Sequence, residues 1–495
     1  MTARDEYAIS EYPDVEAIGK RIADLVAGPP RRLRADRRQA YRAWFTEHCR
    51  ASERRAAEAE EYIPGGVQHN LALNEPFALE AVRADGAYLW DADGNRYIDF
   101  LQAGGPTVLG SNYRPVREKV AELLAGCGPV TGLLHSAEVE LAKIIHDFMP
   151  GVQRFRMLGS GTEGVMAAVR AARAYTGNAH VIKVGGAYHG WSDQVVYGLR
   201  LPGTGALEAA GIPAGAYELT HEVYPNDLDG LREQLAANRE AGGTAAVLVE
   251  PVGPESGSHP AAPGYNHRVR ELCDEFGALL VFDEVVTGFR LGLGGAQGYF
   301  GVRPDLTVFG KCVAGGYPAA GGVGGSAEVM SVFAGGLTAA GTRAFVGGTL
   351  SANPLSCVAG YHSLVEMERT GAAVKAGRAG DRLRAGLERI IGRYELPYVV
   401  YNFGSIVHLH TSGVLHLDLR DPGFFDELGP RKDMLGEMSM AFAAEGMITL
   451  AGSRLYTSMA DTDDVVDEAL AAFARVFAGV DGVPGAAPAP VRDGR

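Results

Sequence analysis

Residues 278–284 read ALLVFDE and residues 305–311 read DLTVFGK. Each stretch is a short apolar run that ends in charge, at Asp283 in the first and at Lys311 in the second. Such runs predict buried strands of a parallel sheet. A single lysine at a strand end is most often an ordinary surface residue. A buried carboxylate needs a cationic partner, however, so the pair raises the question of a shared ligand.

The composition is that of a globular protein with more than one domain. The chain has 495 residues, of which 46% are hydrophobic and 21% are charged. This length exceeds what one hydrophobic core usually supports. The net charge of -14 argues against nucleic acid or an anionic membrane as the main partner. The basic run at residues 29–38 is the exception, and we interpret it as the solvated start of a helix.

Cysteine usage and the absence of long apolar segments favour a cytoplasmic protein. The five cysteines are scattered and contain no CxxC pair, which argues against a disulfide framework and a zinc site. The first residues have no apolar core of the signal-peptide type. The sequence contains no stretch of about 18 apolar residues, so no membrane span is expected.

The pattern along the chain predicts an α/β fold. Helical spacing predicts helices at 14–28 and 34–61, and Asp93-Gly94 predicts the turn of a hairpin over 87–100. Apolar strands then alternate with helices between residues 154 and 311, which predicts a large, doubly wound, mostly parallel sheet domain. Long helices and short strands after about residue 350 predict a smaller α+β domain.

These patterns divide the chain into five expected parts. They are a helical N-terminal extension (1–60), a segment expected to pack with the small domain (61–105), the large sheet domain (106–350), the small C-terminal domain (351–480) and a disordered Pro/Gly/Ala-rich tail (481–495).

Four polar features follow predicted strands, where open α/β sheets bind ligands. Ser160–Thr162 begin a helix, either as a simple capping box with Glu163 or as a phosphate cradle. Tyr188 and His189 follow the next strand, as core aromatics or as a face for a flat ring.

The other two features are Asp283 and Lys311 themselves. Asp283 can cap a helix or partner a protonated ring nitrogen, and Lys311 can condense with an aldehyde. Pyridoxal phosphate is one small molecule that uses all four features, because it has a phosphate, a flat ring, a ring nitrogen and an aldehyde.

Several motifs together resemble the class III aminotransferases, which are pyridoxal-phosphate enzymes of fold type I. The resemblance is greatest to the glutamate-1-semialdehyde aminomutase branch and spans residues 60 to 475. It rests on YIPGGV, GAYLWDADGNRYIDF, GSGTE, GGAYHG, VEPV, LLVFDEVVTGFR, PDLTVFGK and GGTLSANPLSCVAG.

The resemblance implies roles for the site residues. Lys311 holds the cofactor as a Schiff base and moves the substrate proton, while Asp283 pairs with the ring nitrogen. Tyr188 stacks on one face of the ring and Val285 lies on the other. The remaining cofactor contacts implied are Ser160, Gly161, Thr162, His189 and Asn226, and Thr349 reaches the neighbouring subunit of a homodimer with shared active sites.

The substrate end departs from the aminomutase pattern. The aminomutases carry a carboxylate-binding arginine after their GGV motif, and this chain has Ala72 in its place. Alanine cannot form the paired hydrogen bonds of an arginine fork. Gln68, His69 and Arg454 are the substrate-contact residues considered instead, each with a structural role as the alternative. The altered loop would also suit an amine or an aromatic or otherwise apolar amino acid.

Three functions remain open from the sequence. The first is an aminotransferase that moves an amino group between an amino acid or amine and a keto or aldehyde acceptor. The second keeps the cofactor but acts as an aminomutase, or as an amino-acid racemase or epimerase. The third is a non-catalytic scaffold, against which the intact Lys311 and Asp283 argue, since a scaffold needs no Schiff base.

Overall fold

The computed structural model describes residues 6–205, 210–335, 341–483 and 491–492. They form two compact units. Unit 1 contains the residues up to Tyr7 together with Arg114–Gly371, and unit 2 contains Ala8–Tyr113 together with Ala372–Arg495. Most of the expected disordered tail, at 484–490 and 493–495, lies outside the described residues.

Unit 1 is built on a seven-stranded sheet in the part of the chain that the structure describes. The strand order is β4-β10-β9-β8-β7-β5-β6, and only β10 runs antiparallel to its neighbours. The strands are β4 (Arg154–Leu158), β5 (His180–Val184), β6 (Thr220–Val223), β7 (Thr244–Val249), β8 (Leu279–Asp283), β9 (Leu306–Gly310) and β10 (Gly321–Gly325). The predicted doubly wound, mostly parallel sheet is confirmed.

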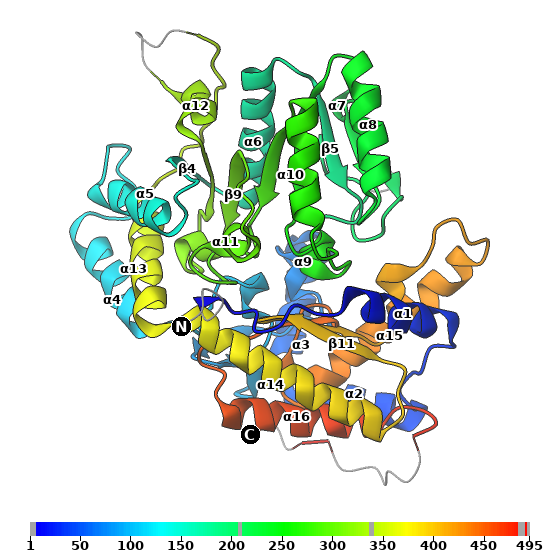
Figure 1. Ribbon diagram of the computed structural model, residues 1–495. Coiled ribbons are helices and arrows are strands. Elements are labelled where there is room, and N and C mark those ends of the chain that lie inside the picture. The colour runs from blue at the N-terminus through cyan, green and yellow to red at the C-terminus, as the bar shows by residue number, and fades with distance from the viewer. Residues whose placement is uncertain (1–5, 206–209, 336–340, 484–490, 493–495) are drawn as a thin grey trace. The chain divides into compact units, whose positions relative to one another are not determined.

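Alternating side chains of the central strands enter two separate cores. On β7, Ala246 and Leu248 pack with helix α6 (Gly161–Thr176), whereas Val247 and Val249 pack with α8 (Leu228–Glu240) and α10 (Tyr265–Phe276). Figure 1 shows these three helices alongside the strands of the sheet. Both faces are therefore covered, which explains why the strands are continuous apolar runs.

The remaining helices of unit 1 pack around this sheet or connect its strands. The longest is α13 (Pro354–Thr370), which packs against α4 (Arg114–Gly126) and α5 (Ser136–Phe148). Unit 1 thus extends to Gly371, whereas the sequence placed the domain boundary at 350. The short helices are α7 (Ala214–Tyr217), α9 (Pro254–Gly257), α11 (Gly295–Phe300) and α12 (Ala327–Met330).

Unit 2 has two small sheets and a helical layer in its described part. The sheets are β1-β2-β3-β13 and β11-β12-β14, with strands Ala81–Asp85, Tyr88–Asp91, Arg96–Asp99, Met447–Ile448, Val399–Phe403, Ile406–His410 and Arg454–Tyr456 in that order. The predicted hairpin over 87–100 is confirmed as the antiparallel pair β2–β3. The long helices are α1 (Val15–Ala27), α14 (Ala372–Arg393), α15 (Phe424–Ala444) and α16 (Asp463–Ala478).

The single helix predicted over residues 34–61 is wrong. The structure has α2 (Ala35–His48) and α3 (Arg50–Tyr62), separated by Cys49. Cys49 is fully buried, and the carboxylate of Asp93 accepts the amide N–H groups of Ala51 and Ser52 at 2.8 and 3.1 Å. A side chain from the hairpin therefore caps the second helix, and the chain turns at Cys49 to reach it.

None of the helices that the structure describes is long and apolar enough to cross a membrane.

Candidate functional site

The carboxyl ends of four strands meet at one edge of the unit 1 sheet. Strands β5, β8 and β9 are parallel, and β4 points the same way because β10 is antiparallel to both β4 and β9. The residues at or just after these ends include Ser160, Tyr188, Asp283 and Lys311. The structure therefore brings together the four features expected from the sequence.

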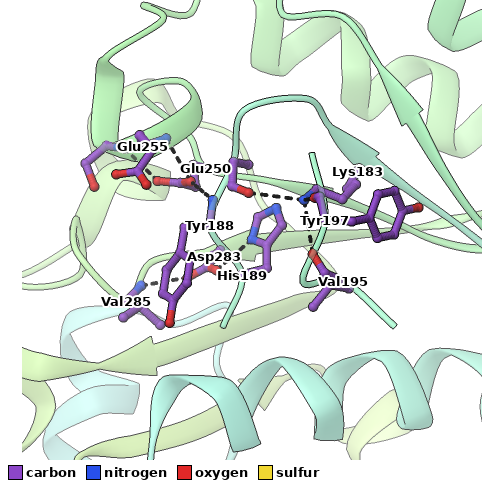
Figure 2. Close-up of polar contacts among 11 residues, drawn as sticks. Lys183, Tyr188, His189, Val195, Tyr197, Glu250, Glu255, Asp283 and Val285 are labelled. Atoms are coloured by element: carbon purple, nitrogen blue, oxygen red, sulfur yellow. Dashed lines mark hydrogen bonds and ion pairs between the residues drawn. The ribbon is translucent and has the colours of Figure 1, made fainter. Parts of the chain in front are cut away.

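Asp283 ends β8 and is buried. Its Oδ1 atom accepts the amide N–H of Val285 at 3.0 Å, and its Oδ2 atom lies 2.8 Å from Nδ1 of His189 (Figure 2). A carboxylate only accepts, so Nδ1 carries the hydrogen. The alternative of a helix cap does not apply, because no helix begins at Asp283.

Burial favours the neutral form of the His189 imidazole. Burial lowers its pKa, and this effect outweighs the hydrogen bond and the charge of Asp283, which favour the protonated form. Its Nε2 atom is buried and has no hydrogen-bond partner among the described residues. The ring therefore donates to Asp283 and keeps one acceptor unused.

Tyr188 is held by its backbone and leaves its ring accessible. Its amide N–H donates to Oε1 of Glu250 at 3.0 Å, and its side chain is half-exposed. Glu250 also accepts the amide N–H groups of Glu255 and Ser256, at 3.0 and 2.7 Å. Burial, followed by the charges of Asp283 and Glu255, raises the pKa of Glu250 to about 8.

The first turn of α6 contains unused donors. Ser160 caps the helix through its hydroxyl, which accepts the N–H of Glu163 at 3.2 Å and forms one half of the capping box considered from the sequence. The carboxylate of Glu163 accepts the N–H of Gly159 at 2.8 Å. Within the described part of the chain, the N–H groups of Gly161 and Thr162 have no acceptor. Free donors at a helix start are suited to an anion.

Glycines allow these segments to approach one another closely. A Cβ atom on Gly161 or Gly310 would lie 2.8 or 2.7 Å from a methyl carbon of Val285. A Cβ atom on Gly190 would lie 2.5 Å from Oγ1 of Thr162. Val285 therefore packs between the helix start and the strand that leads to Lys311, and the loop after β5 contacts the same helix start.

Lys311 directly follows β9, the neighbour of β8. Asp283 pairs with Val308 of β9, three residues before Lys311, so Asp283 and Lys311 lie at the same end of adjacent strands. The backbone of Lys311 has a φ of 45°, which is the left-handed region. Such a conformation is uncommon in residues other than glycine and is often found at functional sites.

Two further expected cofactor contacts, Asn226 and Thr349, also belong to unit 1. Asn226 follows the edge strand β6, which pairs with β5, the strand that precedes Tyr188 and His189. Its amide donates to the carbonyl of Pro260 at 2.9 Å and accepts the N–H of Ala262 at 2.7 Å, so it holds a neighbouring loop. Thr349 is exposed on unit 1. Their roles toward a cofactor or a second subunit stay predictions.

The three suggested substrate contacts belong to unit 2. Gln68 and His69 are exposed, and Nδ1 of His69 accepts the N–H of Leu71 at 3.0 Å. Arg454 begins β14 and is buried beside His408 of β12. Their contact with a substrate stays a prediction.

Of two buried residues beside Tyr188, sequence reasoning missed Lys183 and placed Glu250, of the VEPV motif, near the site without a role. Lys183 lies within strand β5, all of whose residues are buried. Glu250 directly follows the fully buried strand β7. The signal was present in both cases, because a charged residue inside or directly after an apolar strand requires partners.

Comparisons with known proteins agree with this geometry. Residues 72–413 match the family model described as aminotransferase class-III. A glutamate-1-semialdehyde 2,1-aminomutase of Lachnoclostridium phytofermentans is 39% identical over 363 residues, which are 72% of this chain and 82% of that protein.

Two solved structures have similar folds. The omega-transaminase of Sphaerobacter thermophilus has a TM-score of 0.77 and 31% identity, covering 88% of this chain and 98% of its own. The beta-phenylalanine aminotransferase of Variovorax paradoxus has a TM-score of 0.75 and 29% identity, covering 93% and 98%.

Proposed function

Because the chain belongs to the class III aminotransferase family, we propose that it binds pyridoxal phosphate and transfers an amino group from an amino acid or amine to a keto or aldehyde acceptor. The observation that carries this proposal is the arrangement at the sheet edge. A lysine and a buried carboxylate follow neighbouring strands, beside an accessible tyrosine ring and a helix start with unused donors.

The residues present suit this cofactor. The N–H groups of Gly161 and Thr162, with the hydroxyls of Ser160 and Thr162, would hold the phosphate. Tyr188 and Val285 would lie against opposite faces of the ring. Asp283 would face the ring nitrogen, which needs an anionic partner when it is protonated.

When bound, pyridoxal phosphate supplies an aldehyde that takes up the amino group and a ring that accepts electrons from the substrate carbon. Lys311 would bind that aldehyde through Nζ and then carry the proton to and from the substrate carbon. Asp283 would keep its negative charge against the ring nitrogen. The N–H of His189 orients the Asp283 carboxylate for this task.

An aminomutase of the glutamate-1-semialdehyde type is the second candidate. It is favoured by the 39% identity to a relative of that name. The loss of the substrate arginine at Ala72 argues for a different substrate. An aminotransferase accepting an apolar or aromatic amino donor is therefore the leading proposal, and the aminomutase is tested beside it.

We also propose a homodimer. Large apolar side chains of unit 1 are exposed, with 78% of Leu133, 80% of Leu134 and 84% of Phe345 accessible. Where large exposed apolar side chains form one patch, they are typical of an interface. Sedimentation equilibrium tests this proposal, and a monomer at micromolar concentration would contradict it.

The reaction is tested by the visible spectrum of the cofactor-loaded protein during exposure to single amino donors. The panel contains β-phenylalanine, α-amino acids, simple amines and glutamate-1-semialdehyde. If the protein is a transaminase, a donor should bleach the visible band of the cofactor and release one equivalent of keto product per bound cofactor. An aminomutase instead isomerises glutamate-1-semialdehyde with no net keto product. If no member of the panel gives either result, both proposals are contradicted.

A further inference from the structure

Lys183 is a charged residue in a place where the fold otherwise contains apolar side chains. It lies in β5, where Ile182 and Val184 enter the core with α8 and α10, so alternation places Lys183 on the opposite face with Val181. Its side chain has no solvent exposure. An ammonium group in such a position is costly unless each of its hydrogens has an acceptor.

Three backbone carbonyls of one segment supply these acceptors. Nζ of Lys183 donates to the carbonyl oxygens of Ala187 and Val195 at 3.1 Å and to that of Tyr197 at 2.5 Å (Figure 2). The ammonium also lies 5.3 Å from the centre of the Tyr197 ring. The three donor hydrogens thus hold residues 187–197 in one conformation.

One peptide group of this segment is held from both sides. The carbonyl of Ala187 and the N–H of Tyr188 belong to the same planar peptide unit. The carbonyl accepts from Lys183 at 3.1 Å, and the N–H donates to Glu250 at 3.0 Å. Two buried side chains from neighbouring strands therefore fix the plane from which the Tyr188 side chain projects.

We propose that Lys183 is a positioning residue that, with Glu250, fixes the Ala187–Tyr188 peptide so that the Tyr188 ring is already oriented for the cofactor before the cofactor binds. This inference rests on the proposed function for its ligand. Ordering a segment in advance removes a cost that binding would otherwise carry. Loss of the ammonium leaves three buried carbonyls unsatisfied and releases the segment.

The test is a titration of cofactor-free protein with pyridoxal phosphate, followed by visible absorbance, for four proteins. They are the wild type, Lys183→Met, Tyr188→Leu and the double variant. Lys183→Met is expected to raise the dissociation constant about tenfold, the loss of roughly one charged hydrogen bond. In the Tyr188→Leu protein, Lys183→Met is expected to reduce the free energy of cofactor binding by less than about half as much as it does in the wild type. The reason is that Lys183 acts on binding through the Tyr188 ring.

Arg270→Leu is the matched control. Arg270 is largely buried in α10 of the same unit, and its guanidinium lies 2.6 Å from Asp305, away from the segment 187–197. Its loss is expected to lower stability while the dissociation constant stays within about twofold of wild type. If Lys183→Met does not fold, Lys183→Gln replaces it, with an expected rise of about threefold because an amide retains donors.

Two results would overturn the inference. One is an unchanged dissociation constant in the Lys183 variant, and the other is an equal loss with and without the Tyr188 ring. Hydrogen exchange at the Tyr188 amide separates this inference from the proposed function. Protection in the cofactor-free wild type that is lost in the Lys183 variant supports positioning even if no cofactor binds, and equal exchange contradicts it.

Discussion

Nδ1 of His189 donates to Oδ2 of Asp283 over 2.8 Å, and both side chains are buried. The histidine comes from the loop after β5 and the aspartate from the end of β8. Burial keeps the pKa of His189 low, so the ring donates as a neutral group and leaves the negative charge on Asp283 for another partner.

Replacing His189 with alanine removes the one side-chain hydrogen-bond donor to Asp283 within the described part of the chain. We expect kcat/KM for amino transfer to fall about 10- to 100-fold, which corresponds to a lost hydrogen bond to a charged group. His189→Gln keeps a donor and should recover part of the loss. Steady-state kinetics with the best donor provide the measurement, and an unchanged kcat/KM in His189→Ala would contradict this role.

Glu250 predicts a pH dependence of stability. Its folded pKa, raised by burial to about 8, exceeds its ordinary value of 4.5. Between these two values the folded protein binds more protons than the unfolded chain, so this group's contribution to stability is lost as the pH rises. Urea unfolding from pH 4.5 to 8.5 should show wild type losing stability relative to Glu250→Gln. A difference that is constant with pH would contradict it.

Gly190→Ala should damage the site more than a comparable glycine substitution elsewhere. Gly190 has a φ of 87°, and a Cβ atom there would lie 2.5 Å from Oγ1 of Thr162. Gly211 has a similar φ of 84° but no atom within 4 Å of an added Cβ. Thermal unfolding should show about 1–3 kcal/mol more destabilisation in Gly190→Ala than in Gly211→Ala. Equal losses would show that the Thr162 contact is unimportant.

The packing of Tyr7 indicates that the start of the chain stabilises the fold. Its ring occupies a notch beside Gly292 and Gly294, where added Cβ atoms would lie 2.6 and 2.7 Å from it, and it stacks edge-on with Tyr299 at 5.7 Å. Tyr7→Ala should lower the unfolding free energy by roughly 1–3 kcal/mol through lost packing. Tyr62→Ala is the control, because Tyr62 is 78% exposed. Similar stability of the two variants would contradict the role.

The sheet and most of the site could be predicted because their signals are local. Strands β8 and β9 are uninterrupted apolar runs, and Asp283 and Lys311 follow directly in the sequence. The parallel arrangement then brings the strand ends to one edge without further information. The left-handed backbone of Lys311 was not predictable, because nothing in the residue type favours it.

What sequence reasoning missed depends on partners far along the chain. The break at Cys49 requires the carboxylate of Asp93 from a hairpin beyond α3. Lys183 finds its acceptors on backbone carbonyls, which have no sequence signal of their own. The amide of Asn226 is engaged by the loop at 260–262, which its motif alone does not indicate.

The most direct test of the central claim is to locate the lysine that binds the cofactor. The loaded protein is reduced with borohydride, which makes a carbon–nitrogen bond between cofactor and lysine permanent, and its peptides are mapped by mass spectrometry. The account predicts that the label lies on Lys311 and that Lys311→Ala loses both label and visible band. A label on Lys183, on another lysine or on none would contradict it.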